Sequence, residues 1–179
     1  MGQREILVQI IHVLNHHRIE YLLTGSLAVS YYGFPRATHD IDFVIETTPN
    51  QLGKVKLAIS DLGPDYIGEA LDSSFFNLYH AETGIKIDLW LVSPDEFTTK
   101  FKRKQTMRVG RQTINLISPE DLILTKLRWC KEAKSERHMR DCAGILEVQK
   151  GKLDMTHLRK MAKEFEVESL FREAGDYPV

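Results

Sequence analysis

Two short segments, LLTGS at residues 22–26 and THDIDFVI at residues 38–45, decide the fold of this chain. The first is an apolar strand followed by a glycine and a serine, which permit a sharp turn and cap the start of a helix. Amides in the first turn of a helix can bind an anion. The second segment places Asp40 and Asp42 on one face of an apolar strand. Two acids in such a strand are costly unless a cation offsets their charge, which predicts a metal ion.

A third acid lies on a later strand with the same character. Residues 75–80 and 85–92 are expected to form a hairpin around residues 82–84, and Asp88 alternates there with apolar side chains. If this strand lies beside the strand of Asp42, three carboxylates converge on one sheet face. Such a cluster repels itself without metal and can hold two divalent cations.

Together, Gly25-Ser26, Asp40-x-Asp42 and Asp88 resemble the signature of the polymerase-β-type nucleotidyltransferase superfamily. Within this superfamily, the chain is most similar to the small prokaryotic nucleotidyltransferases, a group that includes minimal and AbiEii-like proteins. The similarity in motif order and spacing covers residues 20–92.

The resemblance implies a role for each motif residue. Gly25 and Ser26 would bind the nucleotide phosphates, and Asp40 and Asp42 would hold two Mg²⁺ ions, which Mn²⁺ can replace. Asp88 would hold the catalytic ion and help to deprotonate the acceptor. The enzyme would then move a nucleoside monophosphate from a nucleoside triphosphate (NTP) to a hydroxyl group, with release of pyrophosphate.

The identity of the acceptor stays open between a small molecule, a tRNA and a protein. In one alternative the chain is an AbiEii-like toxin component that modifies tRNA or a protein and has an antitoxin partner. A basic stretch at residues 100–111 would then be the docking surface, although a solvated helix and hairpin explain the same charges. Its bases are Lys100, Lys102, Arg103, Lys104, Arg108 and Arg111. A second alternative is a non-catalytic binding or regulatory module with a helical partner protein.

Two further phosphate ligands are suggested by the later part of the chain. Lys126 could reach a phosphate from the helix that begins at residue 118, or its stem could pass along the core edge into solvent. Residues 137–141 (RHMRD) are similar to a basic segment with an aspartate in AbiEii-like proteins, which implies that Arg140 lies near the nucleotide. Surface salt bridges with Asp141 are the other interpretation. That family pattern often has a second acid where this chain has Gly144.

Composition limits the architecture to one compact unit, because 179 residues with 42% hydrophobic and 27% charged side chains can bury a real core. We expect an α+β fold, with a mixed sheet, helices packed on one of its faces and a helical C-terminal part. The predicted division is a nucleotidyltransferase core at residues 1–117 and a helical subdomain at residues 118–179. Helices are expected at 4–17, 27–32, 49–62, 95–104, 118–129, 137–146, 155–165 and 168–174, and further strands at 21–23, 41–46 and in a hairpin at 106–116.

Several other residues have structural interpretations. Cys130 and Cys142 lie in predicted helices, so buried thiols are expected and a disulfide is not. His16 and His17 are expected to be surface histidines, because adjacent helical positions point in different directions. Tyr31 is expected in the core, whereas Tyr32 and Trp90 could fill the core or stack on a base. The longest uncharged run, residues 21–35, is too short to cross a membrane, and a cytoplasmic protein is expected.

Overall fold

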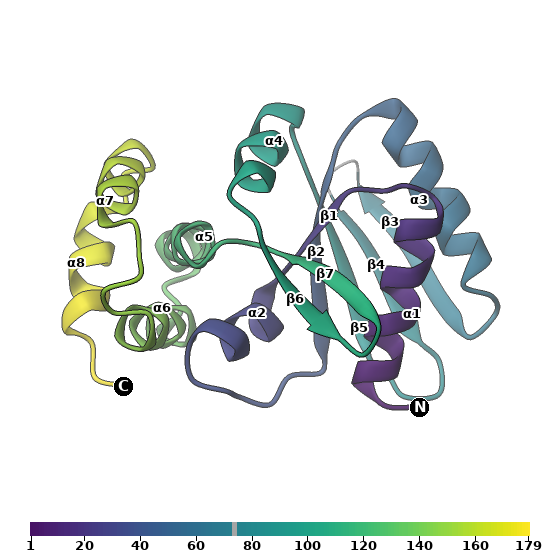
Figure 1. The fold of residues 1–179 in the computed structure, drawn as a ribbon, viewed down its shortest axis with the longest axis horizontal. Helices are drawn as coiled ribbons and strands as arrows, with labels where there is room; N and C mark the ends of the chain where they lie inside the picture. The colour runs from purple at the N-terminus through teal and green to yellow at the C-terminus, as the bar shows by residue number, and fades with distance from the viewer. Residues whose placement is uncertain (73–74) are drawn as a thin grey trace. The chain divides into compact units, whose positions relative to one another are not determined.

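The computed structural model describes residues 1–72 and 75–179 and divides the chain into two compact units (Figure 1). Unit 1 comprises residues 1–27 and 37–117, and unit 2 comprises residues 28–36 and 118–179. The chain therefore enters unit 2 inside a helix, returns to unit 1 at Ala37 and leaves it again after Ile117.

Unit 1 is built on one mixed sheet of seven strands in the order β3-β4-β5-β2-β1-β7-β6. Strand β2 pairs in parallel with β5, and β1 pairs in parallel with β7, whereas the other neighbours are antiparallel. This sheet confirms the predicted fold class. The strands are β1 (Tyr21–Thr24), β2 (Asp40–Glu46), β3 (Tyr66–Asp72), β4 (Phe75–His80), β5 (Lys86–Val92), β6 (Gln105–Val109) and β7 (Gln112–Leu116).

Two helices of unit 1, α1 (Gln3–His16) and α3 (Pro49–Asp61), lie side by side and pack on the sheet (Figure 1). Leu14 of α1, Val55 of α3 and Leu89 of β5 line the same small internal space. Along β2, Ile41 and its alternate neighbours Phe43 and Ile45 are fully buried. Side chains alternate between the faces of a strand, so the aspartates of β2 lie on the opposite face from these apolar residues.

Three helices begin with a hydroxyl side chain followed by proline, as the sequence indicates. Thr48, Ser93 and Ser118 each accept a hydrogen bond from the backbone amide three residues later. These contacts start α3, α4 (Pro94–Lys102) and α5 (Pro119–Ala133). The proline costs nothing in the first turn, because its missing amide would have no partner within the helix there.

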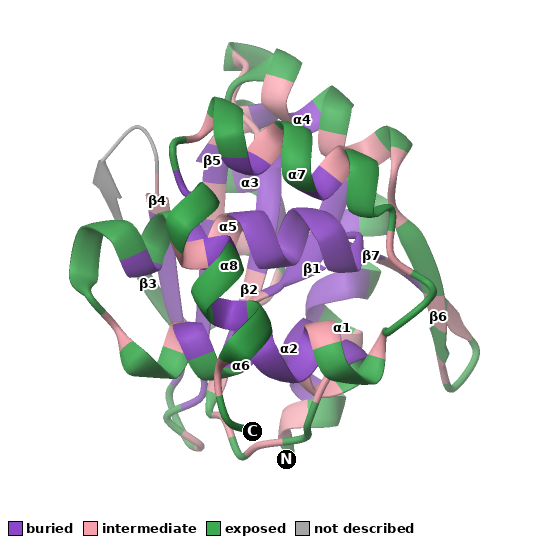
Figure 2. Cartoon of the chain, turned by 90° about the vertical axis from the view of Figure 1, so that its left-hand side faces the viewer, coloured by how far each residue is buried: buried purple, intermediate pink, exposed green. Residues whose placement is uncertain are grey.

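Unit 2 is helical. Helix α2 (Gly25–Tyr32) begins in unit 1 and continues in unit 2, where α5, α6 (Glu136–Val148), α7 (Met155–Glu164) and α8 (Glu168–Asp176) follow. Helix α5 is buried over most of its length (Figure 2). Cys130 and Cys142 are buried free thiols, which confirms the prediction. In the described part of the chain, no helix is both long and apolar enough to cross a membrane.

Strand β3 and the side chain of Tyr31 differ from the sequence-based expectation. Strand β3 was not predicted, because it is an edge strand with Gly68 at its centre and Ile67 exposed on its surface. A Cβ atom at Gly68 would lie 2.2 Å from Cδ2 of Leu78, so the close approach of β4 requires glycine. The prediction for Tyr31 was wrong, since its side chain is 48% exposed, whereas Tyr32 is buried.

Candidate active site

The turn between β1 and α2 packs directly on Asp42. Gly25 has a φ of +62°, and the register of β1 with β2 places Thr24 opposite Asp42. A Cβ atom at Gly25 would lie 1.9 Å from Oδ2 of Asp42. Helix α2 begins at Gly25, two residues earlier than predicted, so the buried Ser26 lies inside its first turn rather than capping it. The first amides of α2 and the carboxylate of Asp42 therefore belong to one tightly packed corner.

Gly25→Ala is expected to disturb this corner in two ways. The left-handed backbone disfavours alanine by about 1–2 kcal/mol. The new methyl group also has to displace the Asp42 carboxylate, so nucleotide binding should weaken as well. Thermal unfolding and nucleotide titration measure the two effects.

Gly53→Ala is the matched control for Gly25→Ala. Gly53 is exposed in α3, and a Cβ atom there has no neighbour within 4 Å. Alanine at this helical position should raise stability by about 0.5–1 kcal/mol. A Gly25→Ala variant with wild-type stability and wild-type nucleotide affinity would contradict the close packing.

The three predicted aspartates meet on adjacent strands. Strands β2 and β5 are parallel neighbours, and their register pairs Asp42 with Asp88 and Asp40 with Lys86. The condition for the three carboxylates to share one sheet face, that these two strands are neighbours, is therefore met. Asp88 is only 5% exposed, whereas Asp40 and Asp42 are half-buried. The carboxylate of Asp40 has no hydrogen-bond or ion-pair partner among residues 1–72 and 75–179.

Asp88 is held by two neighbours from its own sheet. Lys86 places Nζ 2.8 Å from Oδ2 of Asp88, and Asn77 of β4 donates from Nδ2 to Oδ1 at 2.6 Å. Burial raises the pKa of the Asp88 carboxyl above its ordinary value, and the ammonium of Lys86 only partly offsets this effect. Burial alone would lower the pKa of Lys86, but its hydrogen bond to Asp88 raises it, so the amine stays charged. These contacts fix the position of the carboxylate.

Trp90 is a site residue whose role the sequence left open. Its Nε1 donates to Oδ1 of Asp42 at 3.3 Å, and its ring lies 4.5 Å from that of Phe75. The indole therefore orients a carboxylate of the site while packing against an aromatic neighbour. The sequence could not indicate Asp42 as its partner, because this contact depends on the pairing of β5 with β2.

Unit 2 contains a second charged cluster, formed by Arg36, Lys126 and Asp141. Arg36 donates from both Nε and Nη2 to the two carboxylate oxygens of Asp141, each at 3.0 Å, and Nζ of Lys126 lies 2.8 Å from Oδ2. Asp141 and Lys126 are both buried. Burial alone would raise the pKa of Asp141, but the two cations outweigh it and lower that pKa. Because Lys126 is buried and paired, its ammonium does not extend into solvent.

The remaining predictions for this region have mixed outcomes. The surface salt-bridge interpretation of Asp141 is wrong, because its partners are Arg36 and Lys126. Arg140 is exposed and has no polar partner among the described residues. Arg36 was missed, since its partner lies 105 residues away. A Cβ atom at Gly144 would lie 3.0 Å from Cδ2 of Phe34, so a side chain there would require the Phe34 ring to shift.

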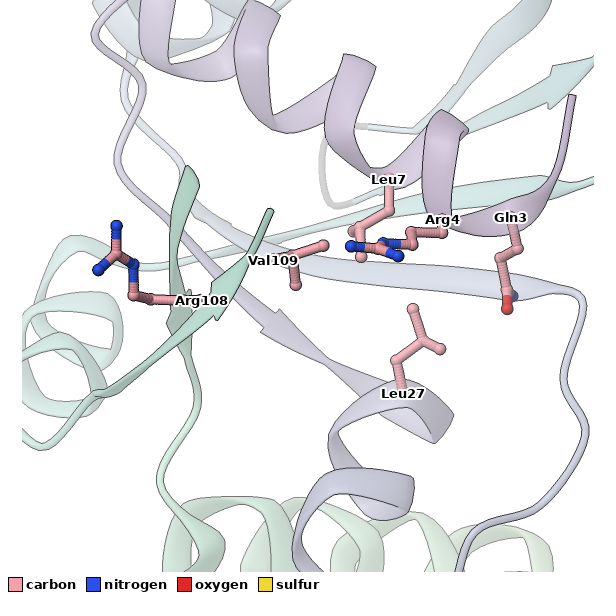
Figure 3. Close-up of a pocket in the computed structure, with 6 residues that line it drawn as sticks. All are labelled: Gln3, Arg4, Leu7, Leu27, Arg108 and Val109. Atoms are coloured by element: carbon pink, nitrogen blue, oxygen red, sulfur yellow. The ribbon is translucent and has the colours of Figure 1, made fainter. Parts of the chain in front are cut away.

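A cavity of about 320 Å³ lies elsewhere in unit 1 and contains none of the predicted site residues in its lining (Figure 3). Its walls are mostly apolar, and Arg108 points away from the others in Figure 3. Gln3 at its edge donates to the backbone oxygen of Thr38 at 3.0 Å. The residues that line it are Gln3, Arg4, Leu7, Leu27, Arg108 and Val109. The chemistry of the three aspartates makes them the better candidate for an active site.

A family model described as "Nucleotidyl transferase of unknown function (DUF2204)" matches residues 3–172. The chain belongs to this family. The match covers nearly the whole sequence and confirms the prediction that the chain is a member of a nucleotidyltransferase family. The protein is therefore a nucleotidyltransferase.

Solved structures share the fold of this DUF2204 chain at low sequence identity. A nucleotidyltransferase-like antigenic protein from Paracoccidioides brasiliensis has a TM-score of 0.59 at 15% identity, over 95% of this chain and 92% of that one. The structure of ANT(2″)-Ia in complex with adenylyl-2″-tobramycin has a TM-score of 0.64 at 13% sequence identity, and the match covers 97% of this chain and 98% of that one. The lincomycin-bound structure of the lincosamide antibiotic adenylyltransferase LnuA has a TM-score of 0.59 at 18% sequence identity, and the match covers 83% of this chain and 98% of that one. Among curated protein sequences, none matches the chain.

Proposed function

We propose that this protein transfers a nucleoside monophosphate from an NTP to a hydroxyl acceptor, with release of pyrophosphate, at Asp40, Asp42 and Asp88. The direct pairing of Asp42 with Asp88 carries the proposal, because this register gathers on one sheet face carboxylates that are far apart in sequence. The contact of Gly25 with Asp42 supports it, since it sets a phosphate-binding helix start against the same carboxylate.

The three carboxylates are suitable ligands for Mg²⁺. The register of β2 with β5 gathers the three carboxylates on one sheet face, where Asp88 already forms an ion pair with Lys86. Carboxylate oxygens are the ligands that Mg²⁺ and Mn²⁺ prefer. Asp40 and Asp42 would hold two ions, and Asp88 would complete the set for one of them. When bound, Mg²⁺ neutralises charge on the triphosphate and polarises the reacting oxygens.

The protein's own groups would bind the donor and accept the proton. Backbone amides at Gly25 and Ser26 would donate to phosphate oxygens, aided by the positive end of the α2 dipole. A carboxylate oxygen of Asp88 would take the proton of the acceptor hydroxyl. The hydroxyl oxygen then bonds to the α-phosphorus, while the bond from that phosphorus to the bridging oxygen breaks and pyrophosphate leaves. Lys86 and Asn77 would keep Asp88 positioned throughout.

Lys126 and Arg140 are further proposed contacts for phosphate. In the cluster of Lys126, Arg36 and Asp141, two cationic side chains bind the same carboxylate. Arg140 offers an exposed guanidinium group. Phosphate oxygens are suitable partners for both side chains.

A small hydroxylated molecule is the acceptor that we propose to test first. Two proteins of the same fold have been solved with a small antibiotic or its adenylylated product, LnuA with lincomycin and ANT(2″)-Ia with adenylyl-2″-tobramycin. Because one of these products carries an adenylyl group, ATP is the first nucleotide to examine. An AbiEii-like activity on tRNA or a protein, with an antitoxin partner, is a separate outcome of the same experiment. A non-catalytic binding or regulatory module is a further possible outcome of this experiment.

The test uses the full chain with each NTP radiolabelled at the α-phosphorus, Mg²⁺, and pools of small alcohols, tRNA and proteins. We expect label in a small-molecule product, none with EDTA, and recovery of activity with Mg²⁺ or Mn²⁺. Label in tRNA or protein would assign the other acceptor class. Calorimetry without any metal-dependent nucleotide binding would overturn the proposal in favour of a non-catalytic module.

A further inference from the structure

The C-terminal ends of α1 and α3 bring together two histidines and an aspartate. His16 is the last residue of α1, His17 follows as its C-cap, and Asp61 is the last residue of α3. Nε2 of His17 lies 2.7 Å from Oδ2 of Asp61. One potential ligand atom from each of the three side chains lies within 4.8 Å of the other two. The cluster is at helix ends, whereas the aspartates of the candidate active site lie on β2 and β5.

We propose that His16, His17 and Asp61 form a binding site for Zn²⁺. Two imidazole nitrogens with one carboxylate oxygen are a typical ligand set for this ion, and Mg²⁺ prefers oxygen ligands alone. The argument that adjacent histidines diverge does not hold here. Their ring centroids lie 5.1 Å apart, with an interplanar angle of 85°. The sequence could not indicate the third ligand, since Asp61 is 44 residues from His17.

The electrostatic environment favours a cation. The C-terminal end of a helix carries partial negative charge, and two such ends meet at this cluster. The carboxylate of Asp61 adds a full negative charge. Its side chain is 57% exposed and His16 is also exposed, so an ion can enter from solvent and keep water in its remaining coordination positions.

The required rearrangement is small. Zinc bonds of 2.0–2.2 Å place the ligand atoms of a tetrahedral site roughly 3.4 Å apart. The ion would insert between Nε2 of His17 and Oδ2 of Asp61, which now lie 2.7 Å apart, so the distance between these two atoms would increase slightly. His16 forms no hydrogen bond among the described residues, and rotation of its exposed ring brings its nitrogen to the ion.

Bound Zn²⁺ would tie α1 to α3. Apolar residues of the two helices, Leu14 and Val55 among them, already pack around one small internal space above the sheet. A ligand that binds only the folded state stabilises it. We therefore expect Zn²⁺ to raise the melting temperature (Tm) by several degrees.

Calorimetric titration of the full chain with ZnCl₂, in an excess of Mg²⁺, tests the site directly. We expect one Zn²⁺ per wild-type chain and at least about tenfold weaker binding after His16→Asn, His17→Asn or Asp61→Asn. The double variant His16→Asn/His17→Asn should also lose the Tm increase with Zn²⁺. Circular dichroism checks that each variant is folded.

His12→Asn is the matched control, because His12 is exposed on the same helix and lies outside the cluster. It should bind Zn²⁺ as the wild type does. Asp42→Asn should do the same, which separates this site from the proposed catalytic one. No Zn²⁺ binding by the wild type, unchanged binding by the double variant, or equal loss in His12→Asn would each overturn the proposal.

Discussion

Replacing Asp42 with asparagine is expected to slow nucleotidyl transfer by at least about a thousandfold. Asparagine has nearly the same shape, and its side-chain oxygen can still accept the hydrogen bond from Nε1 of Trp90. The substitution therefore removes charge from the carboxylate group while leaving β2 and β5 paired. The measurement is the rate of transfer of α-phosphorus label from NTP at saturating Mg²⁺.

The matched control for Asp42→Asn is Asp65→Asn. Asp65 is exposed in the turn before β3 and is not among the proposed site residues. The Asp65→Asn enzyme should transfer the label at the same rate as the wild type. A folded Asp42→Asn enzyme with wild-type activity would show that the reaction does not use this carboxylate.

Asp141→Ala is expected to destabilise unit 2 by about 3–5 kcal/mol, the largest stability effect that we predict. The substitution leaves the buried ammonium of Lys126 and the bidentate guanidinium of Arg36 without their shared carboxylate. The energetic cost is chiefly the uncompensated charge rather than the lost contacts. Urea unfolding followed by circular dichroism measures the change.

Arg140→Ala is the neighbouring control, because Arg140 is exposed on the same helix. Its effect should stay within about 0.5 kcal/mol. The triple variant Arg36→Met/Lys126→Met/Asp141→Leu removes every charge of the cluster and should be more stable than Asp141→Ala. An Asp141→Ala protein as stable as the Arg140→Ala protein would contradict the buried cluster.

Local sequence patterns were sufficient to predict most of the helices and strands. Apolar segments located β2, β4 and β5, and the helices predicted from residues 49, 95 and 118 begin within one residue of α3, α4 and α5. Both kinds of pattern involve residues close together in the sequence, so they can be recognised without knowledge of the fold. Strand β3 lacked such a signal, since pairing with β4 rather than intrinsic preference makes it a strand.

The aspartates were predictable as candidates because acids in apolar strands stand out in sequence. The contacts that complete the site were not. The hydrogen bond of Trp90 to Asp42 depends on the pairing of β2 with β5, and the bidentate pair of Arg36 with Asp141 joins residues 105 positions apart. Such contacts exist only after the chain has folded, and local periodicity contains no information about them.

The basic stretch at residues 100–111 has a structural consequence that does not involve a ligand. Strand β6 ends the sheet and pairs only with β7 among the described strands, so its outer edge presents unpaired backbone groups. Figure 2 shows β6 as mostly exposed. Charged side chains on such an edge discourage pairing with a strand of another molecule. Arg108 on β6 is therefore expected to disfavour pairing of this edge with a strand of another molecule.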